Sequence, residues 1–262
     1  MPRIAEITYQ DSGSKGQPII CLHGIGGNDT SFSSQNSELG NDFRVIAWNM
    51  PGYNGSTPLK NVTFENLSTS LNTLMDALEI PSAHIMGQSI GGMLAQEMAI
   101  RHSHRVKSLI LIATSAAFGG RDDSFKSQFL KARLAPLDAG KTMPKLASEF
   151  VPEITGSIAS EKVLHEAITA MAAVPEATYR QIITCLTSFN RRDEQHLLTM
   201  PVCLIAGELD QNAPASSMKK MATHIPHSHF HIVENAGHLV NSEASDIVND
   251  IVKSFLLSQG QT

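Results

Sequence analysis

The segment 83–96 constrains the fold more than any other part of this sequence. A short apolar run, 83–86, leads into Gly87-Gln88-Ser89-Ile90-Gly91, and apolar residues then recur at the three- and four-residue spacings of a helix. A G-x-S-x-G between a strand and a helix forces a tight, strained turn that raises the serine above the sheet. The segment therefore predicts a buried strand, a sharp turn at Ser89 and a helix.

Two glycine-rich turns can offer backbone N–H groups to a bound oxygen atom. The helix that begins after Ser89 directs its positive end at the serine oxygen, and the N–H of Ile90 lies at that helix start. The second turn, 23–27, lacks the lysine of a P-loop, so phosphate binding is a poor interpretation. Its better use is a second N–H, from Ile25, directed at the same oxygen. A purely structural turn is the alternative at both positions.

Apolar runs with the length of buried strands alternate with amphipathic helical patterns along the chain. Such alternation predicts an α/β fold with a mostly parallel sheet that helices cover on both faces. Strands are expected at 3–12, 18–22, 45–48, 83–86, 108–113, 201–206 and 230–233, and amphipathic helices at 64–78 and 243–257.

The pattern changes between residues 118 and 199, where strand-like runs are replaced by helical periodicity. We therefore expect an α/β core formed by residues 1–117 and 200–262, and an inserted helical lid formed by residues 118–199. Open α/β sheets bind ligands at the carboxyl edge of the strands, so the lid is expected to cover that edge. Helical patterns occur near 125–134, 141–150, 160–173 and 176–189, with Pro136, Pro152 and Pro175 between them. Pocket lining or ordinary helix packing are the two interpretations of the lid residues Phe129, Met143, Phe150 and Met171.

Composition excludes several classes of partner. The 262 residues are 42% hydrophobic, which is ample for a sizeable core, and the net charge is −5 without a basic block. Nucleic acids and anionic membranes are therefore not expected as partners. The chain lacks a run of about 20 apolar residues that could span a bilayer, and a signal peptide is not apparent. The three cysteines, two of them within strand-like runs, indicate a reduced, cytoplasmic protein.

Three polar residues that are far apart in the sequence each follow a predicted strand. Ser89 follows 83–86, Asp210 follows 201–206, and His238 follows 230–233. The carboxyl ends of parallel strands lie along one edge of a sheet, so these side chains can converge. A serine hydroxyl needs a base to take its proton, and the base needs a partner that fixes its orientation.

The sequence is similar to the α/β-hydrolase superfamily over essentially its whole length, and the order Ser…Asp…His is typical of it. Within the superfamily it resembles the small lidded group that contains 3-oxoadipate enol-lactonases, carboxylesterases and carbon–carbon bond hydrolases. Asn49 is a departure, because many members have aspartate there, so a supporting contact is expected to differ. The matching segments are His23-Gly24, Pro51-Gly52-Tyr53-Asn54-Gly55-Ser56, Gly87-Gln88-Ser89-Ile90-Gly91-Gly92, Gly207-Glu208-Leu209-Asp210 with Pro214, and Ala236-Gly237-His238.

The resemblance implies an α/β-hydrolase fold with Ser89 as nucleophile, His238 as general base and then acid, and Asp210 as the carboxylate that orients His238. It also implies an oxyanion hole formed by the N–H groups of Ile25 and Ile90, and neither cofactor nor metal. His23, in the oxyanion loop, is expected to be structural.

Other residues compete for these roles. Glu208 follows the same strand as Asp210 but fits the family position less well, and Asp122 and Asp123 fall in the expected lid. A group of histidines invites a metal interpretation, yet no matching ligand set accompanies it, which favours a solvated sheet edge. These histidines are His224, His227, His229 and His231.

Serine at position 89 argues against epoxide hydrolase or dehalogenase chemistry, for which the family uses aspartate. We expect hydrolysis of a small carboxylic ester or lactone through an acyl-enzyme. The alternatives are a carbon–carbon bond hydrolase of a ring-cleavage product, a slow-turnover ligand receptor, and cofactor-free oxygenation with His238 as base. Arg133, Arg191 and Arg192 either bind a substrate carboxylate or are ordinary exposed arginines. The natural substrate and the oligomeric state stay open.

Overall fold

The computed structural model describes residues 1–13, 15–119 and 123–259. In these ranges eight strands form one sheet in the order β1-β2-β4-β3-β5-β6-β7-β8. The pairs β1–β2 and β2–β4 are antiparallel and the other neighbours are parallel, so the predicted, mostly parallel sheet is confirmed. The strands are β1 Arg3–Ile4, β2 Ile7–Asp11, β3 Pro18–Leu22, β4 Arg44–Trp48, β5 Ala83–Gln88, β6 Val106–Ile112, β7 Val202–Gly207 and β8 Ser228–Val233.

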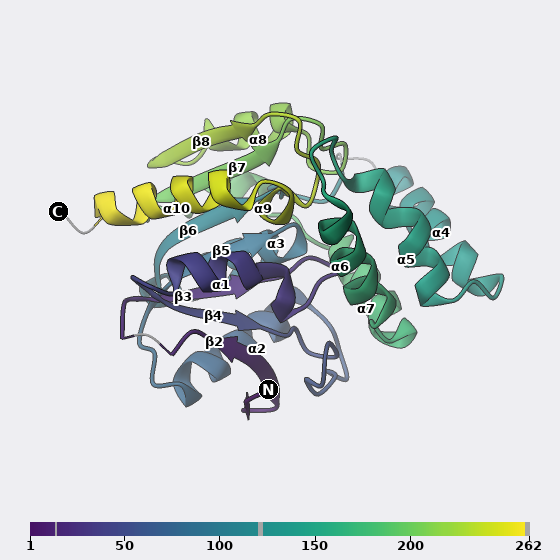
Figure 1. Cartoon of the computed structure of the whole chain (residues 1–262), viewed down its shortest axis with the longest axis horizontal. Coiled ribbons are helices and arrows are strands. Elements are labelled where there is room, and N and C mark those ends of the chain that lie inside the picture. Colours follow the sequence, from purple (N-terminus) through teal and green to yellow (C-terminus); the bar gives the residue numbers. More distant parts are fainter. Residues whose placement is uncertain (14, 120–122, 260–262) are drawn as a thin grey trace.

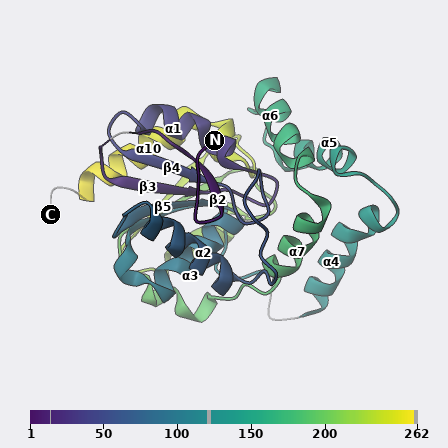
Figure 2. The same ribbon diagram turned by 90° about the horizontal axis from the view of Figure 1, so that it is seen from below.

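Helices cover both faces of the sheet. Helices α1 and α10 lie on one face and α2 and α3 on the other, while α4 to α7 stand at one side of the molecule (Figure 1, Figure 2). The α-helices are α1 Ser33–Leu39, α2 Phe64–Ala77, α3 Ile90–Arg101, α4 Asp123–Asp138, α5 Met143–Ile154, α6 Glu161–Ala172, α7 Glu176–Leu186, α8 Ala215–Ala222, α9 Val240–Glu243 and α10 Ser245–Gln259. Short 3₁₀ turns occur at η1 Asp29–Phe32, η2 Ser103–Arg105 and η3 Arg192–Leu197.

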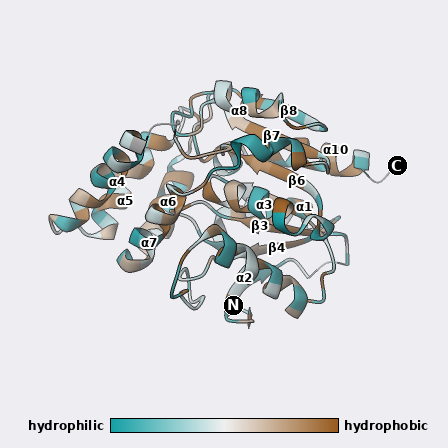
Figure 3. Cartoon of the chain, turned by 180° about the vertical axis from the view of Figure 1, so that it is seen from behind, coloured by the Kyte–Doolittle hydropathy of each residue, from teal (hydrophilic) through white to brown (hydrophobic). Residues whose placement is uncertain are grey.

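The apolar strands divide their side chains between two hydrophobic clusters. In β3, Ile20 and Leu22 pack with residues of α2 and α3, whereas Ile19 and Cys21 pack with residues of α1 and α10. Successive side chains of a strand point to opposite faces, so a strand that is covered on both faces must be apolar throughout. The central strands are accordingly largely hydrophobic in Figure 3, whereas the outer helices carry a mixture of residues.

Several predicted boundaries were wrong for identifiable reasons. Residues 3–12 form two short strands, because Ala5 and Glu6 have φ angles of 47° and 66° and turn the chain back on itself. The helix expected to stop before Pro136 continues to Asp138. Proline in the last turn of a helix removes one hydrogen bond and does not break the preceding turns. The last helix begins at Ser245, after the separate short helix α9.

Four helices, α4 to α7, lie between β6 and β7 in the sequence. Along α5, Leu146, Ala147 and Val151 are buried while the opposite side is exposed, which is the pattern of a helix packed on one face. None of the helices in the described ranges is both long enough and apolar enough to cross a bilayer.

Candidate active site

Ser89 occupies a strained position between β5 and α3. Its backbone has φ 55° and ψ −121°, a conformation that L-residues rarely adopt. The Ser89 N–H donates to the carbonyl of Ile112 at 2.9 Å, and the Ser89 carbonyl accepts from Thr114 Oγ1 at 2.7 Å. These bonds hold the turn in the conformation that the G-x-S-x-G pattern predicts.

The motif glycines are required by close approach of the backbone. A Cβ atom on Gly87 would lie 2.2 Å from the carbonyl oxygen of Gly91, and one on Gly91 would lie 2.0 Å from the carbonyl oxygen of Leu22. A larger residue at either position would push α3 away from β5 or β3. The strand and the helix can therefore meet this closely at the serine only because both positions lack side chains.

The three side chains that follow separate strands come together at one edge of the sheet. His238 Nε2 lies 3.0 Å from Ser89 Oγ, and His238 Nδ1 lies 2.8 Å from Asp210 Oδ2. The imidazole is 12% exposed, and the Asp210 side chain is fully buried. This chain of hydrogen bonds can transfer the serine proton to the imidazole while the carboxylate fixes the orientation of the ring.

Asp210 is held as an anion by its surroundings. Burial on its own raises the pKa of this carboxyl group, but the hydrogen bond and charge of His238 and the N–H groups of Ala213 and Asn212 outweigh it. The resulting pKa is below the ordinary value of an aspartate. Oδ1 accepts the two N–H groups at 2.8 and 3.1 Å, so Oδ2 is left for the imidazole.

The loop that carries His238 is fixed to its surroundings on both sides. Gln88 Nε2 donates to the His238 carbonyl at 2.9 Å, and the His238 N–H donates to the carbonyl of Ile154, at the end of α5, at 2.7 Å. The Glu243 carboxylate accepts N–H groups from Gly237 and Leu239, on either side of His238, at 2.8 and 2.9 Å.

Glu243 also accepts the N–H of Gly156, just beyond α5, at 2.7 Å. Glu243 was not among the residues predicted for the site. The available signal was an acidic residue in the first turn of a short helix, where carboxylates often cap free N–H groups.

The turn after β3 and the start of α3 carry the two N–H groups that were predicted to bind an oxyanion. Within the described residues, neither Ile25 N–H nor Ile90 N–H donates a hydrogen bond to another group of the protein. Tyr53 supports the turn that contains Ile25, because its hydroxyl donates to the Ile25 carbonyl at 2.9 Å.

His23 has a structural place beside this turn. It is fully buried, with Nδ1 2.8 Å from the Gly24 carbonyl and Nε2 accepting the Met50 N–H at 3.0 Å. Burial lowers the pKa of His23 to about 4, so the ring is neutral at neutral pH. Asn49, which departs from the family pattern, still makes a supporting contact, since its Oδ1 accepts the Asp29 N–H at 2.8 Å.

A cavity of about 990 Å³ opens onto Ser89 and His238. Its wall is formed by the strand ends on one side and by α4 to α7 on the other. Of the residues considered as pocket lining, Phe129, Phe150 and Met171 line this cavity, whereas Met143 belongs to the hydrophobic core.

Glu208, which competes with Asp210, makes a different contact. Glu208 is exposed and its carboxylate accepts the Asn235 N–H at 2.9 Å, so it does not contact His238. Asp122 lies outside the described residues, and Asp123 begins α4. His229 and His231 lie on β8, the edge strand of the sheet. Over the part of the chain that the structure describes, no group of three or more histidine, cysteine or acidic side chains is arranged to hold a metal ion.

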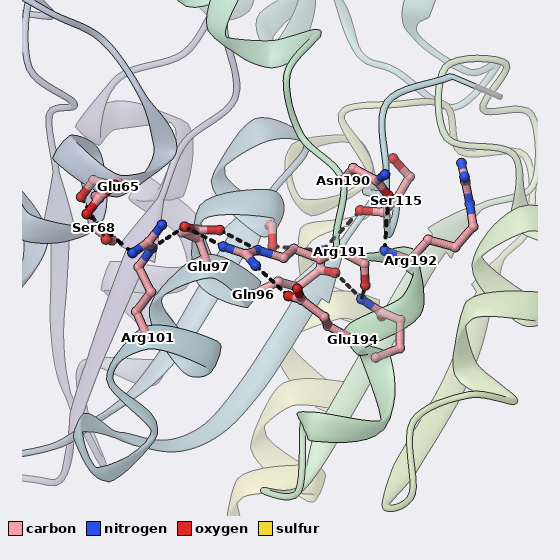
Figure 4. Close-up of polar contacts among 12 residues, drawn as sticks. Glu65, Ser68, Gln96, Glu97, Arg101, Ser115, Asn190, Arg191, Arg192 and Glu194 are labelled. Carbon is pink, nitrogen blue, oxygen red and sulfur yellow. Dashed lines mark hydrogen bonds and ion pairs between the residues drawn. The ribbon is translucent and has the colours of Figure 1, made fainter. Parts of the chain in front are cut away.

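Arg191 is committed to an ion-pair network, shown in Figure 4. Its guanidinium donates to both oxygens of Glu97 on α3, at 2.8 and 2.9 Å, and also pairs with Glu194. Burial raises the pKa of Glu97, but the hydrogen bonds from Arg191 and Arg101 bring it below the ordinary value. Arg191 therefore ties the segment after α7 to the core and is not free to bind a substrate.

The sheet order, the strained serine turn and the hydrogen-bonded Ser, His and Asp side chains together define an α/β-hydrolase architecture. A sequence profile of the alpha/beta hydrolase fold matches residues 17–245, and the chain belongs to this family of enzymes. The predicted fold and family are thus confirmed.

The chain is also similar to individual members of known protein groups. The chain is 25% identical over 255 residues to 3-oxoadipate enol-lactonase 1 of Acinetobacter baylyi, a match that covers 96% of the chain and 93% of that protein. It is 27% identical over 254 residues to the dihydrolipoyllysine-residue acetyltransferase component of the acetoin cleaving system of Pseudomonas putida, covering 95% of the chain but 65% of that longer protein. The crystal structure of the enol-lactonase from Burkholderia xenovorans LB400 superposes with a TM-score of 0.87 over 96% of each chain, at 22% identity, which shows the shared fold.

Proposed function

We propose that the protein is a serine hydrolase that cleaves a small carboxylic ester or lactone through an acyl-enzyme intermediate. In this proposal Ser89 is the nucleophile, His238 the general base and then acid, and Asp210 the orienting carboxylate. The observation that carries the proposal is the continuous hydrogen-bonded line from Ser89 Oγ through His238 to Asp210, at 3.0 and 2.8 Å, on the wall of a cavity.

The first half-reaction follows from the tautomer that this geometry favours. Because Nδ1 faces the Asp210 carboxylate, it carries the proton, and Nε2 is left as an acceptor for the Ser89 hydroxyl. Ser89 Oγ attacks the substrate carbonyl carbon as Nε2 takes the hydroxyl proton. The imidazolium then gives that proton to the leaving oxygen, the bond between carbonyl carbon and leaving oxygen breaks, and the acyl group stays on Ser89.

The second half-reaction uses water in place of the serine. His238 takes a proton from a water molecule, the hydroxide attacks the acyl carbon, and Ser89 leaves with the proton that His238 returns. In both halves the negative charge on the carbonyl oxygen would be stabilised by Ile25 N–H and Ile90 N–H. Loss of one such donor typically costs about 2.7–4 kcal/mol of transition-state stabilisation.

We also propose that residues 118–199 act as a lid over a core formed by 1–117 and 200–262. The wall that α4 to α7 contribute to the cavity supports this division. In such an arrangement the strand ends provide the reactive groups and the helices limit which substrates reach them. The buried cysteines, free in the described structure, support a reduced, cytoplasmic location.

Labelling with a fluorophosphonate, followed by a panel of esters and lactones, tests the proposal. We expect stoichiometric labelling of Ser89, abolished in Ser89→Ala, and turnover of short esters or lactones. A protein that fails to label at Ser89 and cleaves none of the panel would contradict it. Faster cleavage of vinylogous diketones than of esters would favour carbon–carbon bond hydrolysis instead.

A further inference from the structure

Arg133, on α4, is a half-buried cation in the wall of the cavity that also contains Ser89 and His238. Its guanidinium carbon lies 4.0 Å from the ring centroid of Phe150 and 5.4 Å from that of Phe129. Among the described residues, no hydrogen bond and no ion pair engages this guanidinium. Arg133 thus differs from Arg191, whose guanidinium is fully occupied by two carboxylates.

Stacking on aromatic rings leaves the hydrogen-bond donors of a guanidinium unused. The rings contact the face of the group, whereas its N–H donors lie in the plane and point outward from its edges. Desolvation lowers the pKa of Arg133, while Tyr179 and Glu153 partly oppose this effect. Glu153 is exposed and forms no ion pair with Arg133, so the N–H donors remain available to a bound anion.

Tyr179, on α7, is a second polar group without a protein partner in the same wall. The residue is 1% exposed and lines the cavity, and it is close enough to Arg133 to influence its pKa. Within the described ranges its hydroxyl makes no hydrogen bond. The hydroxyl is not one of the fully buried atoms that lack a hydrogen-bond partner, so it is accessible from the cavity. Beside an unpaired guanidinium it can donate a hydrogen bond to a ligand bound there.

The acidic residues of the cavity do not compete for this position. Glu166 and Asp193 line the cavity, but both are exposed to solvent. Arg192 also lines it, and its Nη2 donates to the Gly119 carbonyl at 2.9 Å. Arg133 and Tyr179 therefore bring a half-buried guanidinium and a tyrosine hydroxyl, neither hydrogen-bonded to the described protein, into the wall of one cavity.

We propose that Arg133 and Tyr179 form a subsite for a carboxylate of the substrate, separate from the carbonyl that Ser89 attacks. The guanidinium would bind the two carboxylate oxygens through its in-plane N–H groups, and the tyrosine hydroxyl would donate to one of them. This inference rests on the proposed hydrolysis at Ser89. It narrows the substrate class to esters or lactones whose acyl part ends in a carboxylate.

Matched pairs of 4-nitrophenyl esters test the subsite. Each anionic ester, the monoester of succinate, glutarate or adipate, is compared with the neutral ester of the same acyl length, the butyrate, valerate or hexanoate. We expect the wild-type protein to favour at least one anionic ester over its neutral counterpart in kcat/KM. In Arg133→Met this preference should fall by roughly 10- to 100-fold, the range expected for loss of hydrogen bonds to a charged group.

Three further variants separate a binding role from a general effect of charge or folding. Arg133→Lys should retain part of the preference, because it keeps the charge and loses the paired geometry, and Tyr179→Phe should reduce it several-fold. Lys131→Met removes the same charge from an exposed position of the same helix and should leave the preference unchanged. Glutarate itself should inhibit cleavage of the neutral ester more weakly in Arg133→Met.

The outcomes distinguish this inference from the proposed function. If neutral esters are cleaved and Ser89 is labelled, but no anionic ester is preferred at any length, the subsite is wrong and the hydrolase proposal stands. An equal loss of preference in Lys131→Met would also overturn the subsite, because it would reflect overall charge. If neither ester series is cleaved and Ser89 is not labelled, the proposed function itself is wrong.

Discussion

The strand-end loops and the helices α4 to α7 surround the same cavity but are built on different principles. In the loops, hydrogen bonds fix Ser89, His238 and Asp210. Ser89 is held by Ile112 and Thr114, and Asp210 by two backbone N–H groups. Such a site is preorganised, so little reorganisation is needed during the reaction.

The helices contact the cavity mainly through apolar side chains. Phe129, Phe150 and Met171 contribute apolar surface to the cavity wall and no hydrogen bonds. Arg133 is stacked on aromatic rings and has no polar partner among the described residues. Apolar surfaces tolerate changes of shape better than hydrogen-bonded networks do, because packing is less directional. In the proposed function, the loops would therefore carry the chemistry and the helices would carry the selectivity.

Replacing Ser89 with alanine tests the loop side of this comparison most directly and has the largest expected effect. Loss of the nucleophile from such a triad typically lowers kcat by about 10⁴- to 10⁶-fold. We expect this loss with every ester and lactone, together with loss of fluorophosphonate labelling. Thermal unfolding of the variant provides the control. Activity that survives in a folded Ser89→Ala protein would favour oxygenation with His238 as base.

Asp210→Asn is expected to have the second-largest effect on activity. An amide at this position would favour the wrong tautomer of His238, and we expect kcat to fall by about 10³- to 10⁴-fold. Glu208→Gln is the matched control, because Glu208 follows the same strand, is exposed and contacts the Asn235 N–H instead of His238. Steady-state kinetics should show little change in Glu208→Gln. A large loss there and a small loss in Asp210→Asn would reverse the assignment of the carboxylate.

The difference between the strand-end loops and the helices α4 to α7 also determines what could be predicted from the sequence. The turn at Ser89 depends on local spacing and on glycines whose Cβ atoms would collide with backbone, so a short motif encodes it. The convergence of Asp210 and His238 follows from parallel strands that share one edge. These features were predictable because the geometry is set by neighbours in the sequence or by the sheet.

The contacts that the sequence did not reveal depend on how separate elements pack. Arg133, Arg191 and Arg192 could not be distinguished from their sequence positions, since their roles depend on whether a carboxylate such as Glu97 lies opposite. The contacts of Glu243 reach both the His238 loop and Gly156, which is 87 residues away. Such long-range pairs leave no periodic signal in a single sequence.

The core should also account for a measurable pH dependence of stability. His84, on β5, is 4% exposed, and burial, with a smaller effect of Lys107, lowers its pKa from 6.5 to about 4. Below pH 6.5 the unfolded chain therefore binds a proton that the folded protein does not. The free energy of unfolding should fall by about 3 kcal/mol from this group as the pH decreases from 6.5 to 4.

His84→Gln keeps a polar group beside Ser108 and removes this proton uptake. Urea unfolding at a series of pH values should show a shallower decrease for the variant than for the wild-type protein. Ester hydrolysis at pH 8 should stay nearly unchanged, because His84 lies away from the cavity that contains Ser89. Parallel curves for the two proteins would mean that the histidine titrates equally in the folded and unfolded states.

The smallest effect is expected at Glu243, where the two regions meet. One carboxylate oxygen accepts N–H groups from Gly156 and Gly237, and the other accepts from Leu239. In Glu243→Gln, one of these acceptors becomes an amide NH₂ that faces an N–H donor. Loss of hydrogen bonds to a charged group should lower kcat by about 10- to 30-fold, with KM little changed, because His238 would lose its alignment with Ser89.

Asp246→Asn removes the same charge from an exposed position nearby and is the matched control. The rate of fluorophosphonate labelling of Ser89, measured well below the unfolding temperature, should fall in Glu243→Gln and stay constant in Asp246→Asn. If Glu243→Gln lowers the unfolding temperature but leaves the labelling rate unchanged, the carboxylate only stabilises the fold. A slower labelling rate in the folded variant would instead mean that the contact between the helices and the His238 loop helps to position the base, so that selectivity and chemistry are linked at this one carboxylate.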